Sequence, residues 1–388
     1  MKTVHKFINR QITATLKSVA KQFPVIFLTG PRQSGKTTLL KKIFSKYNYQ
    51  SLEDPDSRLW ALTEPRDFLD HNAVPLIIDE AQYAPVLFSY IQLIVDEKQK
   101  PGMFILSGSQ NFLMMSKITQ SLAGRVAVIS LLPLSDKELR DAEKIKSTEK
   151  LILTGFYPHL YDKVSDFHIF FRSYINTYVE RDIRTMANIA DINDFIRFMR
   201  ICAGRAGQII NVSSLATDSG IAINTCKAWL TYLSASYIIM LVQPYYKNFS
   251  KRIIKSPKLY FVDTGLLCYL LGISSTEQLA INPLRGSLFE NLFFSELLKK
   301  LSNSGRESNI WFWRDNHGTE IDFIIEEGPG MKCFEVKASK MFHNEHLSGL
   351  KTFDRYSREL SDRYLIYDGT TEREIEGIKL INWRSYFK

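Results

Sequence analysis

The chain has 388 residues, of which 45% are hydrophobic and 23% are charged, and its formal net charge is +9. These fractions are typical of a globular protein with two or three domains, and the basic balance permits nucleic-acid binding without establishing it. The most apolar interior run, residues 237–242, is too short to span a membrane, and residues 1–23 lack the apolar centre of a signal peptide. We therefore expect a cytoplasmic protein that does not bind a membrane and whose distant cysteines are buried thiols: Cys202, Cys226, Cys268 and Cys333.

An amphipathic helix is predicted over residues 3–21, because Ile8, Ile12, Leu16 and Val19 recur at helical spacing. We expect this helix to pack on the domain that follows it, with a nucleic-acid or membrane-surface role as the alternative. Its polar face carries basic residues: Lys2, His5, Lys6, Arg10, Lys17 and Lys21.

A phosphate-binding loop is predicted next, between an apolar strand at residues 24–29 and a helix at residues 38–44. In such a loop the backbone N–H groups face phosphate oxygens, a lysine reaches the β- and γ-phosphates, and a hydroxyl binds Mg²⁺. We assign the lysine role to Lys36 and the hydroxyl role to Thr37. The expected nucleotide contacts are Gly30, Pro31, Arg32, Gln33, Ser34, Gly35, Lys36, Thr37 and Thr38.

A second buried strand is predicted to end at Asp79 and Glu80, where ligands of parallel sheets bind. Asp79 is the expected Mg²⁺ ligand, directly or through water, and Glu80 the group that orients or deprotonates the attacking water. A third strand leads into Ser107 and Ser109, which we favour over Gln110 and Asn111 as contacts of the γ-phosphate or the water. Ordinary turn chemistry explains these polar residues about as well.

Arg125 precedes a fourth predicted strand, residues 127–131. A cation there could complete the catalytic site as an arginine finger or bridge two subunits. The alternative is a surface ion pair.

Several segments together resemble the bacterial and archaeal AAA-type P-loop ATPases that carry a C-terminal DUF4143 domain. The segments are GPRQSGKTT, IIDEAQ, LSGSQ, LAGR, YVERDIR, KSPKLYFVDTGLL, GSLFENLFFSEL, FWRDNHGTEIDFII and FEVKAS, so the resemblance covers nearly the whole chain. It implies ATP rather than GTP as the nucleotide, with Mg²⁺. Many ATPases of this kind complete their site with a neighbour's arginine, so oligomerisation is a further expectation.

The middle of the chain contains a predicted helix-turn-helix. A short helix lies within residues 211–221, and a second helix begins near Asn224 and Thr225 and exposes Lys227 and Thr231. Residues 237–242 and 258–262 could form the strands of a wing. A run of basic residues lies between or beside these strands and favours double-stranded DNA, with an acidic protein partner or a bare solvated surface as alternatives: Lys247, Lys251, Arg252, Lys255 and Lys258.

The last third contains a helix with Glu290, followed by strands that form a predicted hairpin around residues 327–330. A symmetric hairpin places Asp322 opposite Glu335 and Glu320 opposite Lys337. This arrangement is similar to the core of PD-(D/E)xK nucleases, in which Asp322 and Glu335 would bind Mg²⁺, with Glu290 and Lys337 nearby. A charged face on an edge hairpin is the alternative, and such folds are often kept for binding after cleavage is lost.

The sequence therefore predicts an α/β protein of three parts. These are a P-loop ATPase domain with a parallel sheet (1–140), a helical and winged-helix-like domain (141–255) and a DUF4143-type, nuclease-like domain (256–388). Three hypotheses remain open. The protein is an ATPase that acts on DNA, an ATP-gated nuclease, or a nucleotide-dependent scaffold that binds protein and turns over little ATP.

Overall fold

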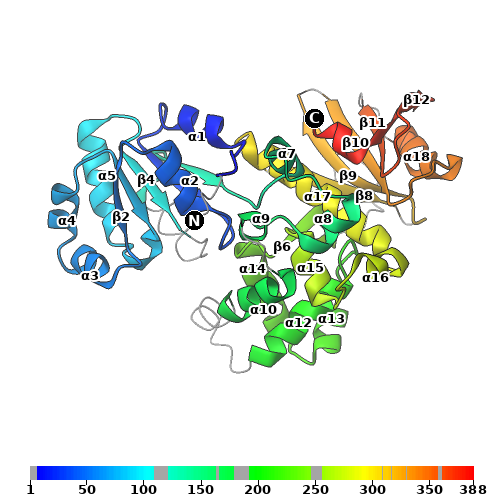
Figure 1. The fold of residues 1–388 in the computed structure, drawn as a ribbon, viewed down its shortest axis with the longest axis horizontal. Helices are drawn as coiled ribbons and strands as arrows, with labels where there is room; N and C mark the ends of the chain where they lie inside the picture. The colour runs from blue at the N-terminus through cyan, green and yellow to red at the C-terminus, as the bar shows by residue number, and fades with distance from the viewer. Residues whose placement is uncertain are drawn as a thin grey trace, which may run out of the picture.

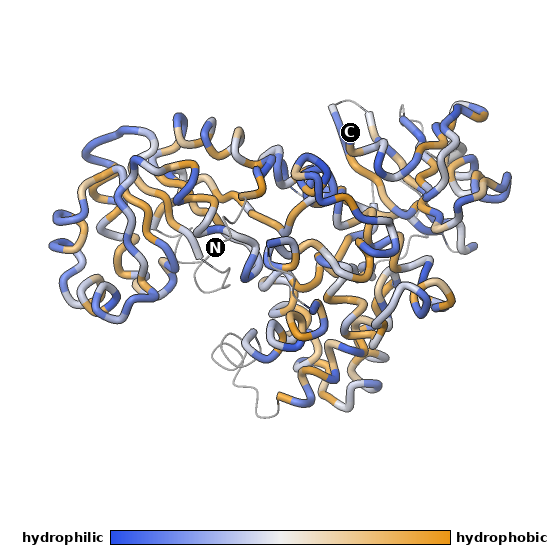
Figure 2. Tube along the Cα trace, viewed as in Figure 1, coloured by the Kyte–Doolittle hydropathy of each residue, from blue (hydrophilic) through white to orange (hydrophobic). Residues whose placement is uncertain are grey.

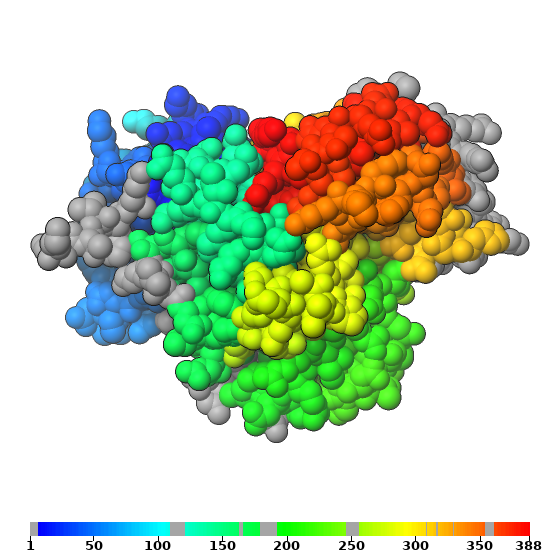
Figure 3. Space-filling view, turned by 45° about the vertical axis from the view of Figure 1, so that its right-hand side comes forward, coloured from blue at the N-terminus to red at the C-terminus, as the bar shows by residue number. Residues whose placement is uncertain are grey.

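A computed structural model of the chain describes residues 7–108, 121–162, 166–178, 192–245 and 256–388, apart from 308, 316, 329 and 357–360. Figure 1 shows an α/β unit formed by the N-terminal third, helices in the middle of the chain, and a second sheet formed by the C-terminal third. In Figure 3 the blue-green residues from the middle of the chain lie between the blue N-terminal unit and the red and orange C-terminal residues, and the green residues lie below them. Among the described residues, no helix combines the length and apolar character needed to cross a bilayer.

The N-terminal unit is a five-stranded sheet in the order β2-β3-β4-β1-β5, and every pair in it is parallel. Its strands are β1 (Val25–Thr29), β2 (Asn48–Ser51), β3 (Leu76–Asp79), β4 (Phe104–Ser107) and β5 (Val126–Ser130). The strands β1, β3 and β4 are buried on both faces and consist largely of apolar residues, as buried parallel strands require, and Figure 2 shows the strands of this unit as mainly hydrophobic. The α/β class and the parallel sheet are thus as predicted, with β2 as an additional edge strand.

Helices cover both faces of this sheet. One face packs against α1 (Thr13–Val19) and α2 (Lys36–Ile43), and the other against α4 (Pro65–His71) and α5 (Leu87–Lys98). The helix α3 (Pro55–Thr63) precedes α4, and a short 3₁₀ turn, η1 (Ala81–Tyr83), follows β3. Proline at the first helical position starts both α3 and α4, because that position needs no backbone N–H donor.

The middle of the chain is mainly helical, and its apolar residues share one core with the C-terminal sheet. Gly220 joins α13 to α14 in the left-handed conformation, with φ of 69°. The two consecutive helices are as predicted, but α14 begins after Ala222 rather than at Asn224 or Thr225. The helices are α7 (Asp136–Asp141), α8 (Thr148–Thr154), α9 (His159–Asp162), α10 (Phe167–Tyr178), α12 (Ile192–Gly204), α13 (Val212–Ser219), α14 (Ile223–Ala235), α15 (Thr264–Leu270) and α16 (Thr276–Ile281).

The C-terminal sheet has eight strands in the order β12-β13-β11-β10-β9-β8-β6-β7. The two strands predicted for a wing, β6 and β7, pair antiparallel with each other, and β6 also pairs with β8, so both belong to this sheet. The strands are β6 (Ile239–Pro244), β7 (Lys258–Phe261), β8 (Ile310–Arg314), β9 (Glu320–Glu327), β10 (Gly330–Lys337), β11 (Ser361–Tyr367), β12 (Arg373–Ile375) and β13 (Ile378–Asn382). The long helix α17 (Arg285–Asn303), the 3₁₀ turn η3 (Asn344–Leu347), α18 (Ser348–Tyr356) and α19 (Trp383–Tyr386) complete the domain.

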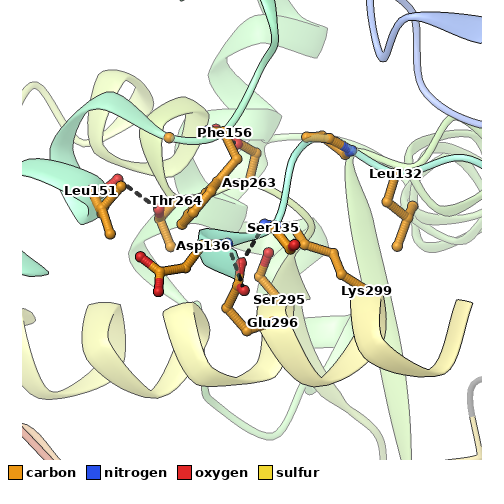
Figure 4. A network of polar contacts seen from close by, with 12 residues as sticks. Leu132, Ser135, Asp136, Leu151, Phe156, Asp263, Thr264, Ser295, Glu296 and Lys299 are labelled. Atoms are coloured by element: carbon orange, nitrogen blue, oxygen red, sulfur yellow. Dashed lines mark hydrogen bonds and ion pairs between the residues drawn. The ribbon is translucent and has the colours of Figure 1, made fainter. Parts of the chain in front are cut away.

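Helix α17 carries a buried polar junction to the rest of the molecule (Figure 4). The Glu296 carboxylate accepts a hydrogen bond from the backbone N–H of Asp136 at 2.9 Å and pairs with the Lys299 ammonium at 2.8 Å. Lys299 also lies 3.5 Å from the centre of the Phe156 ring. Both charged side chains are only 1% exposed, so each depends on the other for its neutralisation.

Replacing Glu296 with alanine should therefore destabilise the fold strongly. The variant leaves the Lys299 ammonium buried without its carboxylate, and breaking a buried pair in this way costs about 3–5 kcal/mol. Urea denaturation followed by circular dichroism measures the loss. Asp70→Ala is the control, because it breaks the exposed pair with Arg66 and should leave the transition unchanged. If Glu296→Ala changes the unfolding transition as little as Asp70→Ala does, the fold does not depend on the buried pair of Glu296 and Lys299.

Candidate nucleotide-binding site

The loop between β1 and α2 has the shape of a phosphate cradle. Gly30 (φ 139°) and Gly35 (φ 93°) both have backbone conformations that L side chains rarely adopt. A Cβ at Gly30 would in addition lie 2.2 Å from the backbone oxygen of Leu131. Gly35 is the N-cap of α2, so the first turn of that helix opens toward the loop.

The Lys36 side chain lies within this loop. Its ammonium donates to the backbone oxygens of Gly30 at 3.0 Å and Pro31 at 2.9 Å, and the residue is 7% exposed. The cation is therefore already in the cradle that phosphates would occupy.

The carboxylate of Asp79, at the end of β3, accepts hydrogen bonds from three hydroxyl groups. Its Oδ2 accepts from Thr37 Oγ1 at 2.7 Å and from the Tyr49 hydroxyl at 2.9 Å, and its Oδ1 accepts from Ser107 Oγ at 2.5 Å. Asp79 is 4% exposed. The structure thus brings together Thr37, Asp79 and Ser107, three residues that the sequence analysis selected.

Tyr49 is a residue of this site that the sequence analysis missed. It comes from the edge strand β2, and burial, with the charge of Asp79, raises the pKa of its phenol well above the usual value. The hydroxyl consequently stays protonated and acts as a fixed hydrogen-bond donor to the carboxylate.

Glu80 follows Asp79 in a left-handed conformation, with φ of 55°. Its carboxylate accepts a hydrogen bond from the Gln82 side-chain amide. Burial raises the pKa of Glu80, although Lys36 and Gln82 oppose that shift. The residue lines the same cavity as the phosphate loop.

The cavity has a volume of about 970 Å³ and lies between the N-terminal unit and the middle helices. Its polar lining residues include Arg32, Lys36, Thr37 and Glu80, and also Asp162 and Asp166. Its other walls are formed by the N-terminal segment and by residues before and within α9 and α10: Phe7, Ile8, Leu134, Pro158, His159, Ile169, Phe170 and Tyr174. The space is large enough for a nucleotide, since small-molecule sites commonly measure about 300–1,000 Å³.

Arg125 does not reach this cavity. It precedes β5, at the amino ends of the parallel strands, whereas the phosphate loop follows the carboxyl end of β1. Its guanidinium forms a two-pronged ion pair with Asp96, at 2.5 and 2.9 Å. The structure therefore shows the alternative for Arg125, an ion pair at the surface, while a role as an arginine finger or bridge toward a neighbouring subunit stays a prediction. Ser109, the other predicted sensor residue, lies outside the described residues.

The C-terminal hairpin has the predicted register. Pairs from Gly330↔Glu327 to Phe334↔Phe323 place Asp322 next in line with Glu335. Asp322 accepts from the backbone N–H of Val336 at 2.8 Å, and Glu335 pairs with the Lys337 ammonium at 2.5 Å. Burial raises the pKa of Glu335 to about 8 and that of Glu290 to about 7.

Lys258 was predicted to contact DNA, but it is buried beside this hairpin and is 2% exposed. Its ammonium contacts Glu290 at 3.2 Å, lies 3.8 Å from Asp322 and pairs with Glu320. Burial lowers its pKa, but the surrounding carboxylates outweigh burial and raise the pKa well above the usual value. Lys258 is therefore an internal counter-ion, which corrects the prediction.

The other predicted DNA contacts, Lys247, Lys251, Arg252 and Lys255, lie outside the described residues. Among the residues that are described, no group of three or more His, Cys, Asp and Glu side chains is arranged to hold a metal ion. The carboxylates of Glu290, Glu320 and Asp322 lie around the Lys258 ammonium.

A parallel sheet with a phosphate loop after one strand, and an aspartate at the end of another, defines a P-loop nucleotide-binding protein. Three sequence-family models match consecutive parts of the chain. The AAA domain AAA_14 matches residues 22–140, the domain of unknown function DUF8612 matches 145–277, and DUF4143 matches 285–386. The chain belongs to the family of AAA-domain P-loop ATPases that carry a C-terminal DUF4143 domain.

Two relatives span most of the chain. An uncharacterized protein of Mycobacterium tuberculosis is 30% identical over 332 residues, which cover 84% of this chain and 73% of the relative. An uncharacterized protein of Haemophilus influenzae is 21% identical over 393 residues, 92% of this chain and 93% of the relative.

Two solved structures are similar to parts of this chain, each with a TM-score below 0.5. The Walker-type ATPase of Pyrococcus abyssi has 16% identity, 69% coverage of this chain and 97% of its own, and a TM-score of 0.45. AMPPCP-bound DnaA from Aquifex aeolicus has 12% identity, 57% and 85% coverage, and a TM-score of 0.29.

Proposed function

We propose that this protein binds Mg²⁺-ATP at the phosphate loop and hydrolyses its γ-phosphate. The observation that carries the proposal is the contact of Asp79 with the Thr37 and Ser107 hydroxyls beside the buried Lys36. A carboxylate and a hydroxyl are oxygen ligands of the kind Mg²⁺ prefers, so these side chains fit the ion. When bound, Mg²⁺ would neutralise charge on the phosphates.

In the proposed reaction each side chain of the site has a separate role. Lys36 would stabilise the negative charge that develops on the γ-phosphate. Glu80 would orient the water or accept its proton, and Ser107 and Tyr49 would hold Asp79 in one orientation. The apolar residues of the cavity lining, among them Ile8 and Phe170, suit a purine base. The resemblance to the family favours ATP over GTP.

Phosphate release tests the proposal. Purified protein with ATP and Mg²⁺ should release phosphate, and chelation of Mg²⁺ should stop the reaction. Binding of ATP without any release would instead favour the scaffold hypothesis. Absence of both binding and release would overturn the assignment.

A DNA-binding role is a second proposal, supported by α14, which exposes Lys227 and Thr231 after the turn at Gly220. We expect Lys227→Glu to weaken binding to a duplex about tenfold, since it replaces a cation near phosphates by an anion. Fluorescence anisotropy at two salt concentrations measures the change. Lys98→Glu, exposed at the end of α5, is the charge-matched control. Equal affinities for both variants and the wild type would contradict the role of α14.

For the nuclease hypothesis, the Lys258 ammonium is the decisive feature, because it contacts Glu290 and lies 3.8 Å from Asp322, one of the two carboxylates that would bind a metal ion. We infer that Glu290 and Asp322 serve to hold Lys258 and that this chain does not cleave DNA. Plasmid incubated with Mg²⁺ and ATP should remain intact. Cleavage that Asp322→Ala abolishes would overturn this inference and restore the nuclease.

A further inference from the structure

Arg10 is a buried cation against the phosphate loop, although its sequence position suggested the exposed polar face of a helix. The residue is 6% exposed and precedes α1 (Thr13–Val19). Its guanidinium has four acceptors within hydrogen-bond distance. Nη1 donates to the backbone oxygen of Ser34 at 2.8 Å, Nη2 to those of Leu132 at 2.6 Å and Pro133 at 3.3 Å, and Nε to Glu138 at 3.1 Å.

The contact with Ser34 fixes one peptide plane of the phosphate loop. In a trans peptide the C=O and the following N–H point in opposite directions. Because the Ser34 carbonyl is directed at Arg10, the N–H of Gly35 is directed away from Arg10. Gly35 is the N-cap of α2, so this N–H is one of the donors with which a helix start meets an anion.

Glu138, the carboxylate partner of Arg10, is itself held by other hydrogen bonds. The Glu138 side chain is 1% exposed and accepts from the backbone N–H groups of Gln11 at 2.7 Å and Ser135 at 2.9 Å, within the capping box of α7. Asp136, which follows Ser135, donates its backbone N–H to the carboxylate of Glu296 in α17 (Figure 4). Arg10 therefore holds the phosphate loop to a helix start that is itself bound to the C-terminal domain.

We propose that Arg10 is a positioning residue of the ATPase site, which keeps the Ser34–Gly35 peptide oriented for phosphate binding before the nucleotide arrives. The proposal rests on the proposed ATPase function. A preoriented donor is effective because it needs no reorganisation when charge develops on the phosphate. The role requires arginine, since the planar fork reaches the loop and Glu138 together, whereas lysine offers a single point of charge.

Arg10→Lys is the test, because it keeps the charge and the pairing with Glu138 but loses the fork. We expect kcat/KM for ATP to fall about tenfold to a hundredfold, with a fall in kcat itself, at a temperature where the variant is fully folded. Lys17→Met, which removes an exposed cation of α1, is the control and should match the wild type. A purely structural role predicts a lower melting temperature with normal kcat and KM for the folded protein.

Glu138→Gln provides a second variant, since it leaves Arg10 in place but removes the charge of its anchor and one of the two oxygens that accept from Gln11 and Ser135. We expect a smaller fall in kcat/KM, and the double variant with Arg10→Lys should lose less than the two single changes combined, because both act on one unit. A wild-type kcat/KM in either folded variant overturns the proposal. The ATPase assignment is judged separately, by turnover in the wild type and its loss in Lys36→Ala.

Discussion

Replacing Lys36 with alanine should lower the rate of ATP hydrolysis about 10²–10³-fold or more and weaken nucleotide binding. The ammonium is buried inside the loop and held by the backbone oxygens of Gly30 and Pro31, where it would meet the phosphates. Removing it takes away the cation that offsets charge in both the bound state and the transition state. Phosphate release and calorimetric titration with Mg²⁺-ATP measure the two effects.

The matched control is Lys42→Ala. Lys42 lies on the same helix, α2, but is exposed to solvent, so its loss should leave turnover within about twofold of the wild type. Similar rates in Lys36→Ala and Lys42→Ala would contradict the assignment of the loop.

Glu80→Gln should separate binding from catalysis. Glutamine keeps the size of the side chain and can still interact with Gln82, but it neither accepts a proton nor carries charge. We expect kcat to fall about 10²–10⁴-fold while the affinity for Mg²⁺-ATP stays near that of the wild type.

The control for this prediction is Glu97→Gln, an exposed glutamate of α5 on the same unit. It should have no effect on kcat. If Glu80→Gln turns over as fast as Glu97→Gln, another group must orient the water, and the role of Glu80 is lost.

Local pattern was sufficient for the phosphate loop and for the hairpin register. The glycine spacing, the apolar strand before it and the amphipathic helix after it are all short-range features, and they place Lys36 within the loop and Thr37 at the start of α2, as the structure shows. The symmetric turn likewise aligned Asp322 with Glu335. In both cases neighbouring residues determine the geometry.

Lys258 and Arg10 were both predicted to lie on exposed surfaces, and both are buried. The two predictions failed for one reason, which is that the partners of these cations are distant in sequence. Lys258 lies 32 residues from Glu290, and Arg10 lies 128 residues from Glu138. A run of basic residues without intervening acids suggests an exposed surface unless those distant carboxylates are known. The predicted polar face of an amphipathic segment gives no sign that one of its residues will be covered by a segment more than a hundred residues away.

Edge strands were also hard to recognise. The strand β2 has four polar or aromatic residues, Asn48–Ser51, and only one of its sides pairs with the sheet, so it lacks the apolar run that identifies the buried strands. Tyr49 was missed with it, although its hydroxyl is one of three that hold Asp79.

Calorimetric titration of the purified protein with ATP tests the central claim most directly, since everything proposed here requires a triphosphate bound in the loop at residues 30–37. We predict saturable binding of one ATP per chain in the presence of Mg²⁺, which weakens when Mg²⁺ is chelated. Absence of any heat of binding at millimolar ATP, for protein shown to be folded, would contradict the account.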